Sequence, residues 1–216
     1  MITNFIVMKK PEKNYRLIIR EYIQETIHEK GYRNITLDEL TDQLRISKKT
    51  FYKNYKDKEE IYKVVLKDEL EDAYRNLVIL LQAKSTMAEK ISRLSTIIEK
   101  NIVLFNTSSL QKIKKEYYGL WKEIILFRKE MVFPLIDFLL DHSKKKDLIK
   151  DYPNEMIIEL FSVGLNLAIE KTFNMSSIQN YRPQYNTIFE ILLNGILTKK
   201  GKKLLAINKR MKNGNN

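Results

Sequence analysis

The chain has 216 residues, of which 44% are hydrophobic, so it can bury the core of one large domain or of two small ones. Six Gly, four Pro and abundant Leu, Ile, Lys and Glu favour a mostly helical protein. The formal net charge of +12 makes a polyanion, either nucleic acid or an acidic membrane surface, the first partner class to consider. The absence of Cys excludes disulfides and thiolate metal sites and fits a reducing cytoplasm.

Residues 1–12 are expected to form an N-terminal extension that ends near Pro11. Their apolar residues precede their charges, which is the reverse of the order in a signal peptide. No segment of the chain reaches about 18 consecutive apolar residues, the length that predicts a transmembrane helix. We therefore expect a cytoplasmic protein without a membrane partner, whose start is either Met1 or Met8.

The first predicted helix covers residues 13–30, and Gly31 stands where a left-handed residue commonly ends a helix. Its apolar residues repeat at intervals of three and four: Tyr15, Ile18, Ile19, Tyr22, Ile23 and Ile27.

A short second helix is predicted after residue 36, and its apolar face is formed by Leu37, Leu40 and Leu44. Thr36 is placed to cap this helix, and Glu39 to return the bond in a capping box. The tripeptide Arg45-Ile46-Ser47 then breaks the pattern.

A third helix over residues 48–54 follows, with Ser47 as its N-cap and Phe51 as its one buried candidate. Asp57 is placed to cap a longer helix that begins near Lys58. Two short helices joined by a three-residue turn form a helix-turn-helix, a motif that lays its second helix in the DNA major groove.

The run from Ile46 to Tyr52, followed by Tyr55 and the run from Lys58 to Ile61, resembles the signature of TetR-type (TetR/AcrR) repressors. The resemblance extends over residues 15–62 and combines about ten positions at fixed offsets. Two positions depart from it: the family usually has Ala where Thr41 stands and Gly where Arg45 stands. If Arg45 takes the left-handed conformation of Gly, the cost is about 1 kcal/mol.

This resemblance implies an all-α protein with a three-helix DNA-binding head over residues 13–58. A six-helix bundle for effector binding and dimerisation would follow over residues 59–207, and a basic, disordered tail over residues 208–216. By resemblance and position, the candidates for base edges are Lys48, Lys49, Thr50 and Asn54. Those for phosphates are Tyr52, Lys53, Lys58 and, besides its capping role, Thr36. Tyr55 is interpreted as core.

Helices of the bundle are predicted from periodicity, caps and breaks over residues 58–82, 86–106, 110–118, 119–142, 155–173 and 183–205. Pro134 is expected to kink the fourth of these. With the head, this makes nine helices and no strand. Mid-helix Gly164 and Gly195 indicate close helix crossings, so the predicted dimer interface contains Gly164, Ala168, Leu192 and Gly195. The alternative is that these two helices pack within one subunit.

Aromatic and polar residues between positions 101 and 173 suggest a ligand site, an expectation that rests mainly on the family resemblance. The candidate lining residues are Asn101, Phe105, Tyr117, Trp121, Phe127, Met131, Phe161 and Asn166. An apolar or a cationic aromatic molecule suits this lining best. The alternative is a plain core, in which aromatic and Met residues only pack.

No pattern of nucleophile, phosphate loop or metal ligands accompanies the two His, so neither an enzyme nor a cofactor is expected. The sequence thus predicts a homodimeric transcriptional repressor, released from an inverted-repeat DNA operator by a small molecule. The alternatives are a non-switching architectural DNA-binding protein and a basic protein that binds acidic membranes through residues 199–212.

Overall fold

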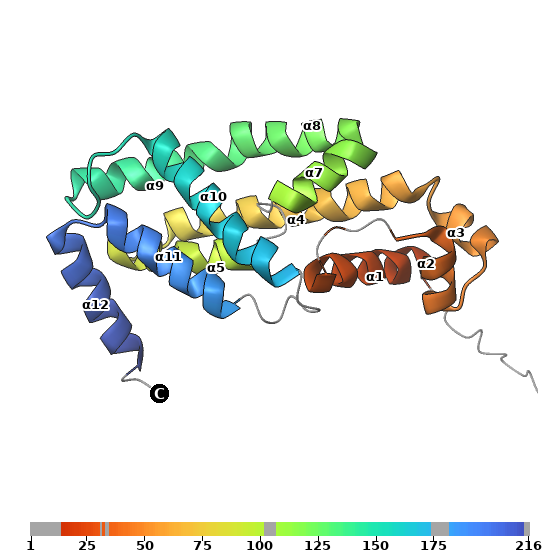
Figure 1. Ribbon diagram of the computed structural model, residues 1–216, viewed down its shortest axis with the longest axis horizontal. Coiled ribbons are helices and arrows are strands. Elements are labelled where there is room, and N and C mark those ends of the chain that lie inside the picture. The colour runs from red at the N-terminus through yellow and green to blue at the C-terminus, as the bar shows by residue number, and fades with distance from the viewer. Residues whose placement is uncertain (1–13, 31, 33–34, 102–106, 174–181, 214–216) are drawn as a thin grey trace, which may run out of the picture.

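The computed structural model describes residues 14–30, 32, 35–101, 107–173 and 182–213. At one end of an elongated molecule, α1 (Tyr15–Lys30), α2 (Leu37–Leu44) and α3 (Lys48–Asn54) form a compact head (Figure 1). The long helix α4 (Lys58–Gln82) runs from this head through the rest of the molecule (Figure 1). An all-helical protein with an N-terminal helix-turn-helix head is therefore confirmed.

The remaining helices form a bundle beyond the head (Figure 1). They are α5 (Met87–Lys100), α7 (Thr107–Glu116), α8 (Tyr118–Phe127), the π-helix η1 (Arg128–Val132), α9 (Phe133–Lys145), α10 (Asn154–Phe173), α11 (Arg182–Ile196) and α12 (Lys199–Asn213). In this bundle α5, α8 and α9 contact α4, and α12 lies at the far end (Figure 1). The only β contact in the described ranges is an isolated bridge between Ile149 and Leu197. None of the helices in these ranges is long and apolar enough to cross a membrane.

Each N-cap predicted in the head accepts the backbone N–H three residues on. The pairs are Thr36 with Glu39 (3.1 Å), Ser47 with Thr50 (3.0 Å) and Asp57 with Glu60 (2.8 Å). These caps satisfy N–H groups that a helix start leaves without intrahelical partners, which explains why α2, α3 and α4 begin where they do. Because the caps are local, their positions could be predicted from the sequence.

Arg45 ends α2 in the left-handed conformation, with φ 51° and ψ 47°. Its N–H donates to the Asp42 carbonyl, and the N–H of Ile46 donates to the Thr41 carbonyl, so the last turn of α2 is closed by the chain itself. The turn therefore keeps the geometry that Gly would allow, although an Arg occupies it.

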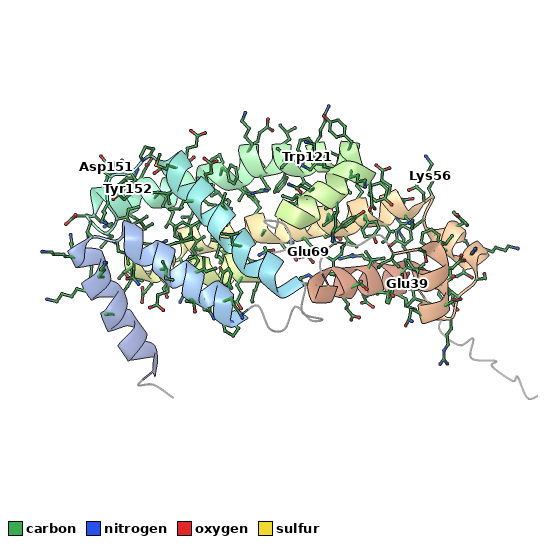
Figure 2. The ribbon with its side chains drawn as sticks, viewed as in Figure 1. Glu39, Lys56, Glu69, Trp121, Asp151 and Tyr152 are labelled. Carbon is green, nitrogen blue, oxygen red and sulfur yellow. The ribbon has the colours of Figure 1, made fainter. Side chains whose placement is uncertain are left out.

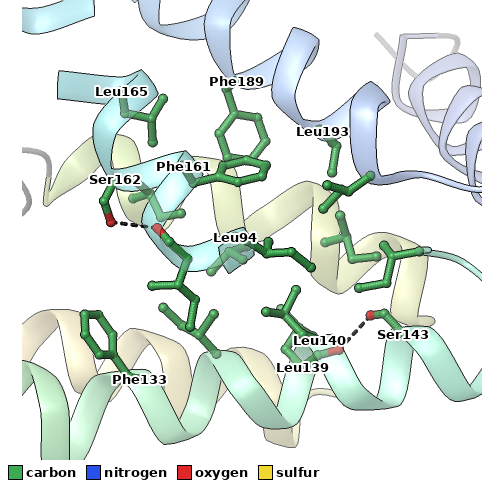
Figure 3. Close-up of a pocket in the computed structure, with 17 residues that line it drawn as sticks. Leu94, Phe133, Leu139, Leu140, Ser143, Phe161, Ser162, Leu165, Phe189 and Leu193 are labelled. Atoms are coloured by element: carbon green, nitrogen blue, oxygen red, sulfur yellow. Dashed lines mark hydrogen bonds between the residues drawn. The ribbon is translucent and has the colours of Figure 1, made fainter. Parts of the chain in front are cut away.

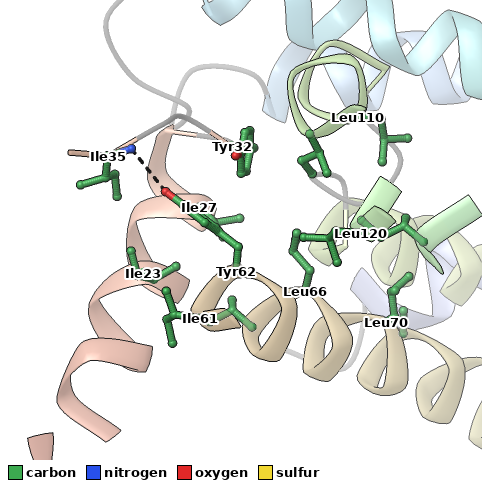
Figure 4. Packing of buried hydrophobic residues seen from close by; sticks show 14 of the residues in the cluster. Ile23, Ile27, Tyr32, Ile35, Ile61, Tyr62, Leu66, Leu70, Leu110 and Leu120 are labelled. Atoms are coloured by element: carbon green, nitrogen blue, oxygen red, sulfur yellow. Dashed lines mark hydrogen bonds between the residues drawn. The ribbon is translucent and has the colours of Figure 1, made fainter. Parts of the chain in front are cut away.

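One hydrophobic core runs without a break from the head into the bundle. Figure 4 shows Ile23 and Ile27 of α1 close to Ile61 and Tyr62 of α4, with Leu120 of α8 near the following turns of α4. The predicted head residues Ile19, Ile23, Ile27, Leu40 and Phe51 are buried, and Leu37, Leu44 and Ile46 pack against them half-buried. Tyr32, Ile35 and Tyr55 are also buried.

The segment predicted as one helix over residues 119–142 is helical throughout, but the π-turn η1 interrupts the α-helical hydrogen bonding between α8 and α9. Pro134 has no N–H to donate, and immediately before it the Phe133 N–H reaches back five residues to the Arg128 carbonyl. The π-turn inserts one extra residue, which rotates the following side chains by about 100°. Val132, 1% exposed, therefore takes the inward position that Met131 would have in an unbroken helix, and Met131 is 39% exposed.

The predicted last helix over residues 183–205 is also divided, at Leu197 and Thr198, between α11 and α12. At Gly201 a Cβ atom would lie 2.0 Å from the Leu148 carbonyl oxygen, so only Gly allows α12 to approach the segment after α9 this closely. The helix α12 continues to Asn213, which corrects the prediction of a disordered tail from residue 208 as far as residue 213. Within the described residues, the division between α11 and α12 makes the count of nine helices wrong.

Candidate DNA interface and effector cavity

The helix α3 presents a polar face to solvent because Phe51, its one buried residue, anchors the opposite face in the head core. Lys49 and Lys53 are exposed, and Tyr52 is 57% exposed. No described group forms an ion pair with Lys49 or Lys53, so both ammonium groups are available to an anion. This face therefore has the donors and the positive charge that a DNA-reading helix needs.

Three other candidates on α3 already have partners. The Lys48 ammonium pairs with Asp38 of α2, which raises the pKa of the lysine through a hydrogen bond and charge attraction. The Thr50 hydroxyl lies 2.9 Å from the Ser47 hydroxyl, and the Asn54 side chain donates to the Thr50 carbonyl at 2.7 Å. A base edge would have to compete with each of these contacts.

Lys58 already has a structural role, besides the phosphate contact that was predicted for it. Its ammonium donates at 3.0 Å to the Ile35 carbonyl, just before α2, and its side chain is half-buried. It ties the first turn of α4 to the start of the helix-turn-helix. A phosphate clamp at this position would share a donor group that the fold already uses.

An open groove of about 580 Å³ lies between α3 and the start of α1. Its walls are formed by Asn14, Tyr15, Ser47, Lys49, Thr50, Lys53 and Asn54. Asn14 and Tyr15 were missed from the sequence, where nothing local connects the start of α1 with a helix 33 residues later. One signal in the sequence could have indicated Asn14 and Tyr15: they form the polar start of α1, and the later turns of α1 contribute core residues to the head.

Arg16 holds this arrangement together. Its guanidinium donates to the Asn54 carbonyl at the end of α3, forms an ion pair with Glu60 at 3.2 Å and lies 4.4 Å above the Tyr55 ring. The Tyr55 hydroxyl in turn donates to the Arg16 carbonyl at 2.8 Å. Tyr55 is buried, so its interpretation as core is confirmed, and it positions α3 against α1 and α4.

The other candidate site is an apolar cavity of about 80 Å³ in the bundle (Figure 3). It is enclosed by α5, α9, α10 and α11, with a lining that includes Leu94, Phe133, Leu140, Phe161, Phe189 and Leu193. Ser143 and Ser162 also line it, but each hydroxyl donates to the carbonyl four residues earlier in its own helix, at 2.7 and 2.8 Å. The cavity therefore offers a ligand an almost purely hydrocarbon surface.

The family model described as bacterial regulatory proteins of the tetR family matches residues 23–65, the stretch that contains α2, α3 and the start of α4. An uncharacterized HTH-type transcriptional regulator of Bacillus subtilis, YvaF, is 22% identical over 173 residues and aligns with 79% of this chain and 89% of its own. The head of this chain is therefore similar to the DNA-binding region of the tetR family of bacterial regulators.

Two solved structures share the fold of this chain. The ketosteroid transcriptional regulator KstR2 of Mycobacterium tuberculosis superposes with a TM-score of 0.64 at 15% identity, covering 87% of this chain and 98% of that one. A transcriptional regulator from Saccharomonospora viridis, solved in complex with choline, superposes with a TM-score of 0.63 at 16% identity, covering 87% and 100%. Since these matches span the bundle as well as the head, both parts of this chain have a TetR-family architecture.

Of the eight residues expected to line a ligand site, Phe161 lines the cavity. Phe105 and the side chain of Asn166 lie outside the described residues. Asn101 is buried but donates to the Ile97 carbonyl at the end of α5, and Met131 faces outward for the reason given above.

The remaining three expected lining residues, Tyr117, Trp121 and Phe127, pack half-buried against the core that joins head and bundle. The Phe127 ring lies 6.2 Å from Tyr74 of α4. Trp121, at the side of the molecule formed by α8, stacks on Tyr118 at 5.5 Å (Figure 2). An aromatic cluster exists as expected, but it lies beside α4 and lines no part of the cavity.

The head and bundle are joined through a cluster of tyrosines. The Tyr32 hydroxyl donates to Glu116 at the end of α7 (2.9 Å), and its ring meets Tyr62 of α4 edge-on at 5.0 Å. Tyr117 completes the cluster, 5.9 Å from Tyr62. Burial and the Glu116 carboxylate both raise the pKa of Tyr32, so its hydroxyl stays protonated and remains a donor.

A second polar contact crosses from α1 to α4 at Glu69, which lies between head and bundle (Figure 2). One Glu69 oxygen lies 2.8 Å from His28 Nε2 and 2.6 Å from the donor amide of Gln24. The hydrogen bond to Glu69 outweighs burial and raises the pKa of His28. Burial alone would raise the pKa of Glu69, but the bonds from His28 and Gln24 lower it.

The helices α10 and α11 carry the residues expected at a dimer interface. A Cβ at Gly164 would lie 2.8 Å from Leu192 Cδ1, so the close approach of these two positions is made within one chain. At Gly195 a Cβ would meet nothing within 4 Å. The side chain of Ala168 is outside the described residues. At Gly164 and Leu192, α10 and α11 thus pack on each other within one subunit, which is the alternative to a dimer contact. Gly195 faces open space.

Large apolar side chains are nonetheless exposed along the outer face of α10 and on α11. They are Met156 (62% exposed), Leu160 (49%), Val163 (55%), Leu167 (53%) and Ile191 (64%), and we call them the α10–α11 stripe. Its four α10 members follow one another at intervals of four, three and four residues, which places them on one side of the helix.

Proposed function

We propose that this chain is a homodimeric, sequence-specific transcriptional repressor of the TetR family. It binds an inverted-repeat operator through α3 and is released by a small molecule of largely apolar character that binds the bundle cavity. It would act in the cytoplasm, without a cofactor.

The observation that carries the DNA-binding role is the outward face of α3, where Lys49, Tyr52 and Lys53 project from a helix whose one buried residue is Phe51. The open groove beside it adds Asn14 and Tyr15 as polar groups at the start of α1. We assign Lys49, Thr50 and Asn54 to base edges, and Tyr52 and Lys53 to phosphates. Lys48 is kept as a base-edge candidate that must first leave Asp38, and Thr36 and Lys58 as phosphate candidates.

Support for a dimer comes from the α10–α11 stripe, because several large apolar side chains exposed on one side of a helix are typical of an interaction site. A helix pair that packs on its own copy forms a four-helix contact with two-fold symmetry. Gly195, which has open space around its Cα, would let the partner helix approach closely. A two-fold dimer presents its two recognition helices to successive major grooves about 34–36 Å apart, hence the inverted repeat.

Support for an effector comes from the cavity, which has the apolar, concave character of ligand sites. The choline complex of the Saccharomonospora viridis regulator is an example of a small molecule bound by a protein of this fold. For release, the ligand must bind the DNA-incompetent dimer better than the DNA-competent one. The helix α4 is the proposed lever, since it contacts α1 in the head and both η1 and α9 beside the cavity.

The alternative is an architectural DNA-binding protein whose bundle is purely structural. The membrane alternative places the basic residues of α12 on an acidic lipid surface. Fluorescence anisotropy distinguishes the repressor from these two alternatives. It is measured with a duplex from the region upstream of the gene and with a scrambled duplex, each over a series of salt concentrations. A repressor binds the first duplex selectively, as one dimer per site and with a steep salt dependence.

Equal, weak binding to both duplexes and to duplexes selected from a random pool would refute sequence-specific recognition. A selective complex that no apolar compound dissociates would instead favour the architectural protein.

A further inference from the structure

We propose that the effector is an amphipathic carboxylic acid, whose hydrocarbon part fills the apolar cavity and whose carboxylate binds Arg128. This inference rests on the proposed function, because it names the ligand class of the proposed effector site. It concerns the chemical class only: an aliphatic or alicyclic chain with one acidic end.

The cavity by itself accounts for the hydrocarbon part. The hydroxyls of Ser143 and Ser162, which line it, are held by helix carbonyls, so the lining leaves little with which to solvate a charged group. A ligand group buried there gains mainly from the removal of apolar surface from water. Any charged or strongly polar end must therefore lie at the edge of the cavity, where another residue receives it.

Arg128 is not part of the lining, but it lies next to one residue that is. It is the first residue of the π-turn and is only 8% exposed, and its guanidinium carbon lies 5.4 Å from the centre of the Phe133 ring. Phe133 is itself part of the cavity wall, at the end of α9 that faces η1 (Figure 3). One aromatic ring thus contacts both the cavity and a buried cation, so a chain in the cavity can direct its terminal group past this ring to the guanidinium.

The positive charge of Arg128 determines that the polar end of the ligand is negatively charged. Burial lowers its pKa to about 10, so the guanidinium remains protonated at neutral pH. In a poorly solvated site, attraction to a carboxylate is stronger than at the surface, and a guanidinium can bind both carboxylate oxygens. A cationic aromatic ligand would meet repulsion in the same place. Arg128 also interacts with other groups of the protein, contacts that a carboxylate would supplement or replace.

The size of the cavity connects binding with movement. A cavity of about 80 Å³ is smaller than the engineered one of about 150 Å³ that holds benzene in another protein, so a longer chain must separate the surrounding helices. The helices α9 and η1, which carry Phe133 and Arg128, both contact α4. An acid bound between cavity and π-turn would therefore act on the helix that we propose as the lever.

The test uses three probes with the same ten-carbon chain: decanoate, decan-1-ol and decyltrimethylammonium. Calorimetric titration of the full chain is expected to show at least tenfold tighter binding of decanoate than of the alcohol, and the weakest binding for the cation. In Arg128→Met, decanoate should lose this advantage while the alcohol binds as before, because the hydrocarbon contacts remain.

Lys129→Met is the matched control, since it removes an exposed cation from the next position of the same π-turn and should preserve the preference. Arg128→Lys keeps the positive charge and should retain part of the preference for decanoate over the alcohol. Thermal unfolding of each variant shows that it is folded, and Arg128→Gln replaces the Met variant if that one is not.

Three outcomes overturn the inference: the alcohol binds as tightly as decanoate, the preference survives in Arg128→Met, or none of the probes binds. The proposed function fails separately. If decanoate binds through Arg128 but leaves operator affinity unchanged, the acid site stands and the ligand-released repressor does not. If acid and alcohol bind equally and both release DNA, the repressor stands and the acid site does not.

Discussion

Arg45 carries a backbone strain that the chain retains at the turn between α2 and α3. An L-residue in the left-handed region is disfavoured by contact between its Cβ and the backbone, whereas Gly has no Cβ. We expect Arg45→Gly to be about 1 kcal/mol more stable than Arg45→Ala, a comparison that removes the Arg side chain from both proteins. Urea unfolding at one fixed protein concentration measures the difference, and an Ala variant as stable as the Gly variant would show that the turn is unstrained.

Lys53 and Lys58 are predicted to differ in their effect on DNA binding, although both are lysines near the proposed interface. Lys53 has an ammonium available to a phosphate, so Lys53→Ala should weaken binding to all duplexes and reduce the slope of log K against log salt by about one unit. Lys58→Ala removes a bond to the Ile35 carbonyl, so it should lower the stability of the head and change the slope less. Anisotropy salt series and thermal unfolding of both variants check this, and equal slopes would contradict it.

The end of α4 depends on a residue of the next helix. The helix has no basic residue in its last turn, and the ammonium of Lys90 in α5 donates to the carbonyls of Leu80, Leu81 and Ala83 instead. It thereby satisfies groups that a helix end leaves without partners and places a positive charge at the negative end of the helix dipole.

Lys90→Met should therefore cost about 2–4 kcal/mol in the free energy of unfolding, because the Leu80 carbonyl remains buried, and those of Leu81 and Ala83 partly buried, after their donor is lost. The control is Lys84→Met, at an exposed lysine beside the same helix end, which should change stability by less than about 0.5 kcal/mol. Denaturant unfolding measures both. A loss of similar size in the two variants would show that the Lys90 bonds contribute nothing specific.

The contact between α1 and α4 at His28 and Glu69 should make stability depend on pH. A raised pKa of His28 in the folded protein gives stability that is complete below its ordinary pKa of 6.5 and is lost as pH rises through the folded value. A lowered pKa of Glu69 gives stability that is present above 4.5 and lost as pH falls through the folded value. The contribution of the pair is therefore largest between these two ordinary values.

The difference in unfolding free energy between the natural chain and His28→Gln should be largest near pH 5–6 and should shrink by pH 9. Because the His28 side chain is 43% exposed, solvent screening limits the effect to about 1 kcal/mol or less. Urea unfolding of both proteins over this pH range provides the measurement. A difference that is constant with pH would mean that the charge of His28 plays no part in joining α1 to α4.

At the scale of the whole molecule, the α10–α11 stripe should hold two copies together. Val163→Asp places a charge in the middle of the stripe and should convert the proposed dimer to a monomer at micromolar concentration, with at least tenfold weaker operator binding. Leu126→Asp, on α8 at a side chain of similar exposure (53%), is the control and should leave the dimer intact. Sedimentation equilibrium distinguishes the two, and a natural chain that is already monomeric would disprove the interface.

The sequence alone determined the features that depend on residues close together in the chain, such as the helix caps and the buried side of α3. Thr36, Ser47 and Asp57 cap helices because a hydroxyl or carboxylate reaches a backbone N–H three residues ahead, whatever the rest of the chain does. Phe51, alone among polar residues at helical spacing, identified the buried side of α3. The head, its turn and its recognition helix could therefore be predicted, and with them the family resemblance.

Tertiary structure alone decided the arrangement of the bundle. The π-turn before Pro134 rotated later residues by about 100°, which exchanged Met131 for Val132 on the inner face. Gly164 received Leu192 of the same chain, and the cavity formed where four helices leave a gap, away from the aromatic cluster. Each of these features depends on contacts between residues far apart in the chain. A helical pattern indicates which residues are apolar, but only packing determines which neighbour they meet.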